Sequence, residues 1–135
     1  MKLHNQEIWL AYPSLVELSK CALPVETSLG VASLINSIQK PYIEIEHKRR
    51  ELVRQYGDTK NNEITVHTSK PKSVNFVVAF GELLEDYCED DITIERVKLP
   101  SQIVISCPSC GDKLHIDFIV DPHMLLPLVQ HFIET

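Results

Sequence analysis

Apolar residues recur every three or four positions through the first half of the chain. The longest such run covers residues 26–56, and its alternating spacing of 4 and 3 predicts one long helix with a single apolar seam. Pro41 lies within this run and predicts a kink, while Gly57 is placed to end the helix. The seam consists of Val31, Ile35, Ile38, Tyr42, Ile45, Arg49, Leu52 and Tyr56.

A shorter helix is expected before it, over residues 5–21, where apolar residues again fall at helical spacing. Pro13 lies in the middle and would kink or break that helix, so a short strand before Pro13 is the alternative. The first helix can cover only part of the long apolar seam. The remainder is expected to contact the second half of the chain or a second subunit.

Beyond residue 58 the pattern becomes mixed, with alternating segments typical of strands. A helix fits residues 74–88, although 74–78 also fits a strand. Asp121 and Pro122 are a typical helix start, while Pro127 would bend the helix that follows. The apolar face of that last helix is expected to consist of Met124, Leu125, Leu128, Val129, Phe132 and Ile133. Residues 59–63 are expected to form a polar turn, and strands are expected at residues 64–68, 91–99 (with a bulge), 103–106 and 113–120.

These elements predict an α+β protein, in which a long kinked helix and shorter helices pack with a small antiparallel sheet. The length of 135 residues suits a single domain, with a helical half (1–58) and a mixed half (59–135). A formal net charge of -6 argues against general binding of nucleic acid through its phosphates. We find no signal peptide and no apolar run near the roughly 20 residues of a membrane span, so no membrane contact is expected.

The candidate metal site lies at residues 107–111, where Cys107 and Cys110 flank a proline and a serine and a glycine follows. Two thiolates on such a tight turn between strands are typical of a zinc knuckle. Structural zinc needs four ligands, and the sequence has no second C-x-x-C pair. The remaining ligands could come from Cys21, Cys88, His115 or His123, or from the cysteine pair of a second copy. The alternative is a hairpin with free thiols.

Two charged segments are candidate binding surfaces. Lys48, Arg49, Arg50 and Arg54 form a basic face on the long helix that could contact an acidic partner or nucleic acid. The simpler interpretation is a solvated helix face, in which Glu44 and Glu46 pair with these bases. The acidic segment comprises Glu82, Glu85, Asp86, Glu89, Asp90 and Asp91, which could bind a cation or mimic a phosphate backbone. A solvated helix end is again the simpler interpretation.

Several segments, in this order, resemble a group of small proteins encoded by tailed bacteriophages and prophages. They are the Leu23-Pro24 opening of the long helix, its Tyr56-Gly57 end, the leucine-rich 80–84 segment, the acidic 91–95 segment and the apolar C-terminus. The resemblance covers most of the chain and implies a phage origin, in the host cytoplasm or the virion. Residues 107–111 depart from the pattern of the group, so the zinc prediction rests on the cysteines alone.

We therefore expect a non-enzymatic phage protein that acts through protein–protein contact, as an assembly component or a modulator of a host protein. The sequence contains no glycine-rich phosphate loop and no nucleophile motif. Self-association through the long helix is a corollary of its uncovered seam. The alternative is a zinc-containing regulator that binds nucleic acid through the basic face.

Overall fold

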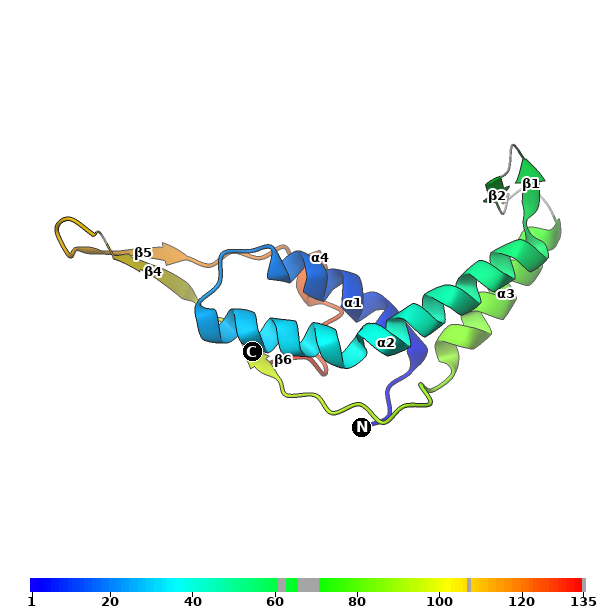
Figure 1. Ribbon diagram of the computed structural model, residues 1–135, viewed down its shortest axis with the longest axis horizontal. Helices are drawn as coiled ribbons and strands as arrows, with labels where there is room; N and C mark the ends of the chain where they lie inside the picture. Colours follow the sequence, from blue (N-terminus) through cyan, green and yellow to red (C-terminus); the bar gives the residue numbers. More distant parts are fainter. Residues whose placement is uncertain (61–62, 66–70, 107, 135) are drawn as a thin grey trace. The chain divides into compact units, whose positions relative to one another are not determined.

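The computed structural model describes residues 1–60, 63–65, 71–106 and 108–134 (Figure 1). Helices and short strand pairs occur together, which confirms the α+β class. In chain order the elements are α1 (Asn5–Ser19), α2 (Val25–Tyr56), β1 (Asp58–Lys60), β2 (Glu63–Thr65), α3 (Pro71–Glu85), β3 (Val97–Lys98), β4 (Gln102–Ser106), β5 (Lys113–Asp117), α4 (Pro122–Leu125) and β6 (Ile133–Glu134).

The chain forms two compact units, and each of them is built from two separate segments. Unit 1 consists of Met1–Leu10 and Ile38–Ile92, and unit 2 of Ala11–Ser37 and Thr93–Thr135. Helices α1 and α2 therefore contribute one end to each unit. The division that we expected near residue 58 falls inside unit 1, and the single-domain prediction stays a prediction.

Helix α1 begins where its first backbone donors find a side-chain acceptor. The Glu7 carboxylate accepts a hydrogen bond from the His4 backbone N–H at 2.8 Å. This is the contact that an acidic residue at the third helical position makes with the N-cap residue in a capping box. Pro13 has no N–H to donate to the preceding turn, yet the helix continues to Ser19. The strand considered before Pro13 is therefore wrong. One fully buried face, comprising Ile8, Ala11, Leu15 and Leu18, stabilises the helix across the proline.

Helix α2 ends at Tyr56 as predicted, and the Gly57 N–H donates to the Val53 carbonyl at 2.7 Å. Pro41 lies inside the helix, and the bend expected there stays a prediction. Leu34 is buried where we expected Ile35, which is only half-buried. The buried row is Val31, Leu34, Ile38, Pro41 and Ile45. The remaining seam residues, Tyr42, Arg49, Leu52 and Tyr56, are half-buried. The buried row of α2 therefore ends at Ile45.

In unit 1 the N-terminal segment is bound to the segment that follows α3. The Cys88 N–H donates to the Leu3 carbonyl at 2.7 Å, and the Asn5 N–H donates to the Asp86 carbonyl at 2.8 Å. The buried Asn5 side chain also donates to the Leu83 carbonyl at 2.8 Å. Leu3 is also fully buried. Backbone hydrogen bonds and apolar burial therefore both hold the N-terminal segment against residues 83–88.

The rest of unit 1 follows the expected elements with shifted limits. Helix α3 confirms the helix expected at 74–88 but starts earlier, at Pro71, where proline suits the first helical turn. The alternative strand over 74–78 is wrong. Strands β1 and β2 pair antiparallel, so residues expected to lie in a turn form a strand instead. Residues 66–68 of the expected strand lie outside the described residues.

The described strands form three separate pairs rather than one sheet. The β1–β2 and β4–β5 pairs are antiparallel, as expected, whereas β3 pairs in parallel with β6. The predicted strand over 91–99 is wrong for residues 91–96 and for Leu99, since β3 covers only Val97–Lys98. Ile92 is buried there outside any strand, and its N–H donates to the Met1 carbonyl at 3.0 Å.

The C-terminal helix is much shorter than its sequence pattern predicts. The Asp121 side chain accepts from the His123 N–H at 2.9 Å, which confirms Asp121 as the N-cap of α4. The helix ends at Leu125, and turns follow. Pro127 provides the physical reason, because it has no N–H to donate to the preceding turn. Leu128 and Phe132, expected on the apolar face of the helix, are still fully buried.

Gly30 of α2 offers a test of the packing in unit 2, because it lies against the buried Val97 of β3. A β-carbon at Gly30 would lie 2.8 Å from the Val97 Cγ2 atom. We expect Gly30→Ala to lower the free energy of unfolding by about 1–3 kcal/mol through overpacking, although alanine normally favours helices. Urea unfolding of the single and double variants with Val97→Ala should show strong coupling, since Val97→Ala removes the clashing methyl. Additive effects would contradict this packing.

Candidate functional site

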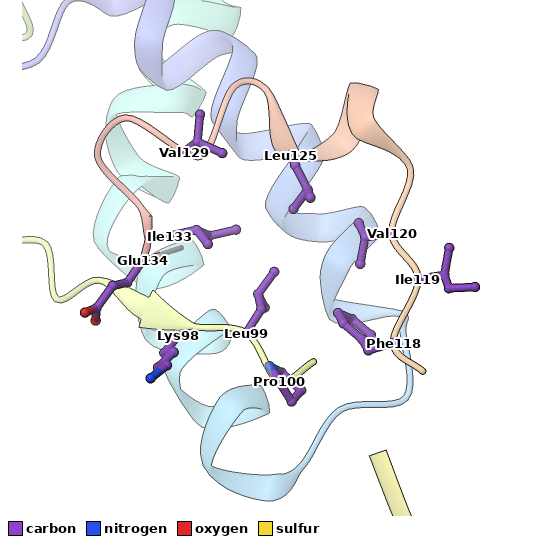
Figure 2. A pocket seen from close by; sticks show the side chains of 10 residues that line it. All are labelled: Lys98, Leu99, Pro100, Phe118, Ile119, Val120, Leu125, Val129, Ile133 and Glu134. Carbon is purple, nitrogen blue, oxygen red and sulfur yellow. The ribbon is translucent and has the colours of Figure 1, made fainter. Parts of the chain in front are cut away.

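The best candidate site is an apolar groove in unit 2, with a volume of about 450 Å³ (Figure 2). Its wall is built from the end of β3, the segment after β5, helix α4 and strand β6. Figure 2 shows Leu99 and Leu125 facing the same space from opposite sides. The lining residues are Lys98, Leu99, Pro100, Phe118, Ile119, Val120, Leu125, Val129, Ile133 and Glu134.

Backbone hydrogen bonds hold the distant segments of this wall together. The Val97 N–H donates to the Phe132 carbonyl at 3.0 Å, which starts the parallel pairing of β3 with β6. The Phe118 N–H donates to the Ser101 carbonyl at 2.9 Å and closes the base of the β4–β5 hairpin. Paired backbone therefore bounds the groove, and the N-capped helix α4 lies between β5 and β6 in the chain.

The groove has an apolar interior and a charged end. Lys98 and Glu134 are neighbours in the β3–β6 register, and their exposed side chains lie together at one end (Figure 2). Ile119 is 87% exposed and Val129 is 41% exposed. Apolar side chains this open to water favour burial against another molecule. One acidic and one basic residue beside them would orient that molecule.

This groove was not among the sites that the sequence predicts. Leu125 and Val129 were assigned to the apolar face of a longer helix, and Leu99 to a strand. The available signal was the apolar run Phe118, Ile119 and Val120, which breaks the alternation of β5 just before the Asp121 cap. A run that leaves its strand pattern before a cap cannot bury all its side chains on one face.

The predicted zinc ligands are placed only in part. Cys107 lies outside the described residues, so the metal site itself is untested. Cys110 is exposed in the β4–β5 connection, His115 is exposed on β5, and Cys88 is buried in unit 1. Over the described ranges, no three His, Cys, Asp or Glu residues gather in a way that could hold a metal ion.

The other candidate ligands have identified surroundings. Cys21 is half-buried just after α1, where its thiol lies 3.8 Å from the Glu17 carbonyl oxygen. His123 lines a shallow hollow with Glu17 and Asp121, beside the start of α4. Both residues belong to unit 2, as Cys110 and His115 do, whereas Cys88 belongs to unit 1.

The predicted basic face on α2 is partly neutralised by its own helix. Arg49 binds the Glu46 carboxylate through two nitrogens, at 2.9 and 2.6 Å, and Arg50 binds it at 3.2 Å. These bonds confirm the expected pairing with Glu46. Lys48 and Arg54 are exposed. The geometry favours the interpretation of a solvated, internally paired face.

The acidic segment also forms local contacts in unit 1. Asp90 lies 3.6 Å from the Lys40 ammonium, and the Lys2 ammonium donates to the Glu89 carbonyl at 2.5 Å. The His4 ring stacks on Tyr87 with a centroid distance of 4.0 Å. These contacts attach the segment to the N-terminus and to α2, which agrees with a structural role.

Comparison of the chain with family models, curated proteins and solved structures finds no match. Among the helices in the described part of the chain, none is long and apolar enough to cross a membrane.

Glu46 provides a pH-dependent test of the α2 ion pairs. Hydrogen bonds from Arg49 lower the pKa of Glu46, and its partial burial opposes them. We expect Glu46→Gln to lower the free energy of unfolding by less than about 1 kcal/mol near neutral pH, because the site is half-exposed.

The pH dependence of that effect has a definite sign. A carboxyl with a lowered pKa stabilises the fold above its unfolded pKa of about 4.3, and the contribution is lost as pH falls through the folded pKa. Urea unfolding should therefore show the Glu46→Gln deficit shrinking in acid. Glu44→Gln, with the same charge change on the same helix, is the control. A deficit that persists unchanged in acid would contradict the pairing.

Proposed function

We propose that this chain is a bacteriophage protein that acts through protein–protein contact rather than catalysis, in the host cytoplasm or the virion. Its partner is either another phage component, in assembly, or a host protein that it modulates. The resemblance of its ordered segments to small phage proteins supports the origin. The apolar groove of unit 2 is the observation that carries the binding function.

The groove suits an extended apolar segment of the partner protein. It opens beside β3 and β6, which among the described strands pair only with each other, so each has a second edge. An extended segment can add to such an edge through backbone hydrogen bonds and place alternate side chains in the adjoining groove. Lys98 and Glu134 at one end favour a segment that carries one charge of each sign beside its apolar residues.

The charged neighbours also argue for a protein segment over a simple apolar ligand. An acidic and a basic group placed in register recognise a partner that offers complementary charges at a fixed spacing. Apolar contacts in the groove would supply most of the affinity, since burial contributes roughly 25 cal/mol per Å². The charged end would supply the orientation.

A pair of matched substitutions tests this proposal. Val129 lines the groove, whereas Leu126 is a more exposed apolar residue, at 67% against 41%, that does not line it. We expect Val129→Asp to abolish capture of a defined protein from phage-infected cells by the tagged chain, and Leu126→Asp to retain it. The physical reason is that a buried, unpaired carboxylate opposes apolar docking.

Circular dichroism should show that both variants remain folded, because both sites are exposed. The captured protein should then bind the purified chain directly in calorimetry, with the same dependence on Val129. If no captured protein is lost on Val129→Asp, or if both variants lose it equally, the groove is not the binding site.

The zinc-containing regulator is the second candidate, and the β4–β5 hairpin favours its metal site. Ser106 and Lys113 are in register, so the segment that connects the strands carries both cysteines of the C-x-x-C pair. Gly111 has a φ of 73°, a left-handed conformation that suits glycine in a tight turn. The contact of such a regulator with nucleic acid would depend on Lys48 and Arg54, since Glu46 already binds Arg49 and Arg50.

Metal analysis separates the two candidates. If the chain is the regulator, the purified protein contains zinc. Combining Cys107→Ser with Cys110→Ser should then remove the zinc and lower the melting temperature. Our leading proposal expects the groove-dependent binding to survive this double substitution. Ser109→Ala in the same turn is the control for local changes. Zinc-free protein with an unchanged fold would eliminate the regulator.

A further inference from the structure

Helix α3 has more apolar surface than unit 1 covers. Eight of its twelve residues from Val74 to Glu85 are apolar, yet none of these described side chains is fully buried. Val74, Val77 and Val78 are 63%, 65% and 54% exposed. A helix gains most of its stability in a protein by burying one face, so α3 lacks the packing that such a composition normally receives.

The exposed side chains form a continuous stripe. Val74, Val77, Val78 and Gly81 are spaced i, i+3, i+4 and i+7, which places them on one side of the helix. We call these four residues the valine stripe. At Gly81, a β-carbon would meet no atom within 4 Å, so the stripe ends in an open notch. Three valines followed by a notch form a surface that can complement itself.

The second half of α2 runs beside α3 in unit 1, and it too has no buried residue, among those described, toward its C-terminal end. Trp9 contacts both Tyr42 of α2 and Phe80 of α3, with ring centroids 5.3 and 5.6 Å apart, so the two helices meet there. Pro41, Ile45 and Lys48 of α2 also share a small pocket with Leu83 and Asp86. Figure 1 shows α3 beside the second half of α2, to which it returns through β1 and β2.

Beyond this meeting point no described side chain of either helix is fully buried. The buried row of α2 ends at Ile45, while the helix continues to Tyr56. Two antiparallel helices alone cannot enclose a core, whereas two such pairs can form a four-helix bundle. We propose that the valine stripe is the interface of a two-fold dimer, in which the α2–α3 pair of one copy packs antiparallel on that of a second copy.

The two-fold geometry follows from the spacing of the stripe. With the axis between Val77 and Val78, each Val77 faces Val78 of the second copy, and each Val74 faces the notch at Gly81 of the second copy. The larger side chain thus fills the open space at the glycine, which allows the two helices to approach closely. Such a self-complementary surface is the requirement for an isologous interface.

Charge complementarity also favours a second copy as the occupant. Arg54 is exposed in the last turn of α2, which lies at the same end of the α2–α3 pair as the start of α3 (Figure 1). Glu82 and Glu85 are exposed near the opposite end of α3. An antiparallel two-fold pairing brings the acidic end of one copy to the basic end of the other. The same ends would repel each other in a parallel arrangement.

Native mass spectrometry and sedimentation of the full chain test this dimer. We expect twice the chain mass of 15.4 kDa for the wild type, with a concentration-dependent return to the monomer. Val77→Asp should remove the dimer, raising its dissociation constant by more than 10-fold, while circular dichroism stays unchanged. Val25→Asp is the matched control, since Val25 is 75% exposed on α2 of unit 2.

A mixing experiment tests the register. V77K and V78D should each be monomeric alone and should form a heterodimer when mixed, because the introduced charges face each other across the axis. Gly81→Leu should also weaken the dimer while leaving the monomer folded, because it fills the notch. A monomeric wild type, a dimer that survives Val77→Asp, or folded V77K and V78D that fail to combine would overturn the proposal. These results are independent of partner binding at the groove.

Discussion

Burial of one row of side chains on α2 is the interaction on which both units depend. Val31 and Leu34 of this row belong to unit 2, and Ile38 and Ile45 belong to unit 1. One helix therefore supplies buried side chains to two cores, and disruption of α2 would destabilise both units. The same row sets the limit of the fold, because it ends at Ile45 although α2 continues for three further turns. Beyond that point the chain has helix without enclosed core, and this shortage leaves α3 uncovered.

Local periodicity was sufficient to predict α1, α2 and α3, because their apolar residues recur every three or four positions. It failed where burial depends on partners far along the chain. The Ile92 N–H donates to the Met1 carbonyl of the N-terminal segment, and the alternating residues around Ile92 do not form a strand. The parallel pairing of Val97 with Ile133 joins residues that no local pattern relates. Pro127 shortens the last helix, and the groove results from that shortening together with the parallel pair. For this reason the candidate site could not be found from sequence.

The ion pairs of the basic face on α2, unlike the groove, could be predicted from the sequence. The pairing of Glu46 with Arg50 was predictable, since residues four apart on a helix are neighbours. This local pairing occupies Arg49 and Arg50 and leaves Lys48 and Arg54 of the basic face exposed. The C-x-x-C segment lies between two strands as expected, while Cys107 lies outside the described residues, so the zinc site stays a prediction. The two apolar surfaces therefore carry the functional account: we assign the valine stripe to a second copy of the chain and the groove to another protein.

Amide hydrogen exchange at low and high protein concentration tests this division most directly. If a second copy covers the valine stripe, protection of the α3 amides will rise with concentration, because association suppresses local opening. The amides of β3, α4 and β6 around the groove should exchange at rates that do not depend on concentration, since their partner is absent. Concentration-independent exchange in α3, or protection that rises around the groove instead, would contradict the account.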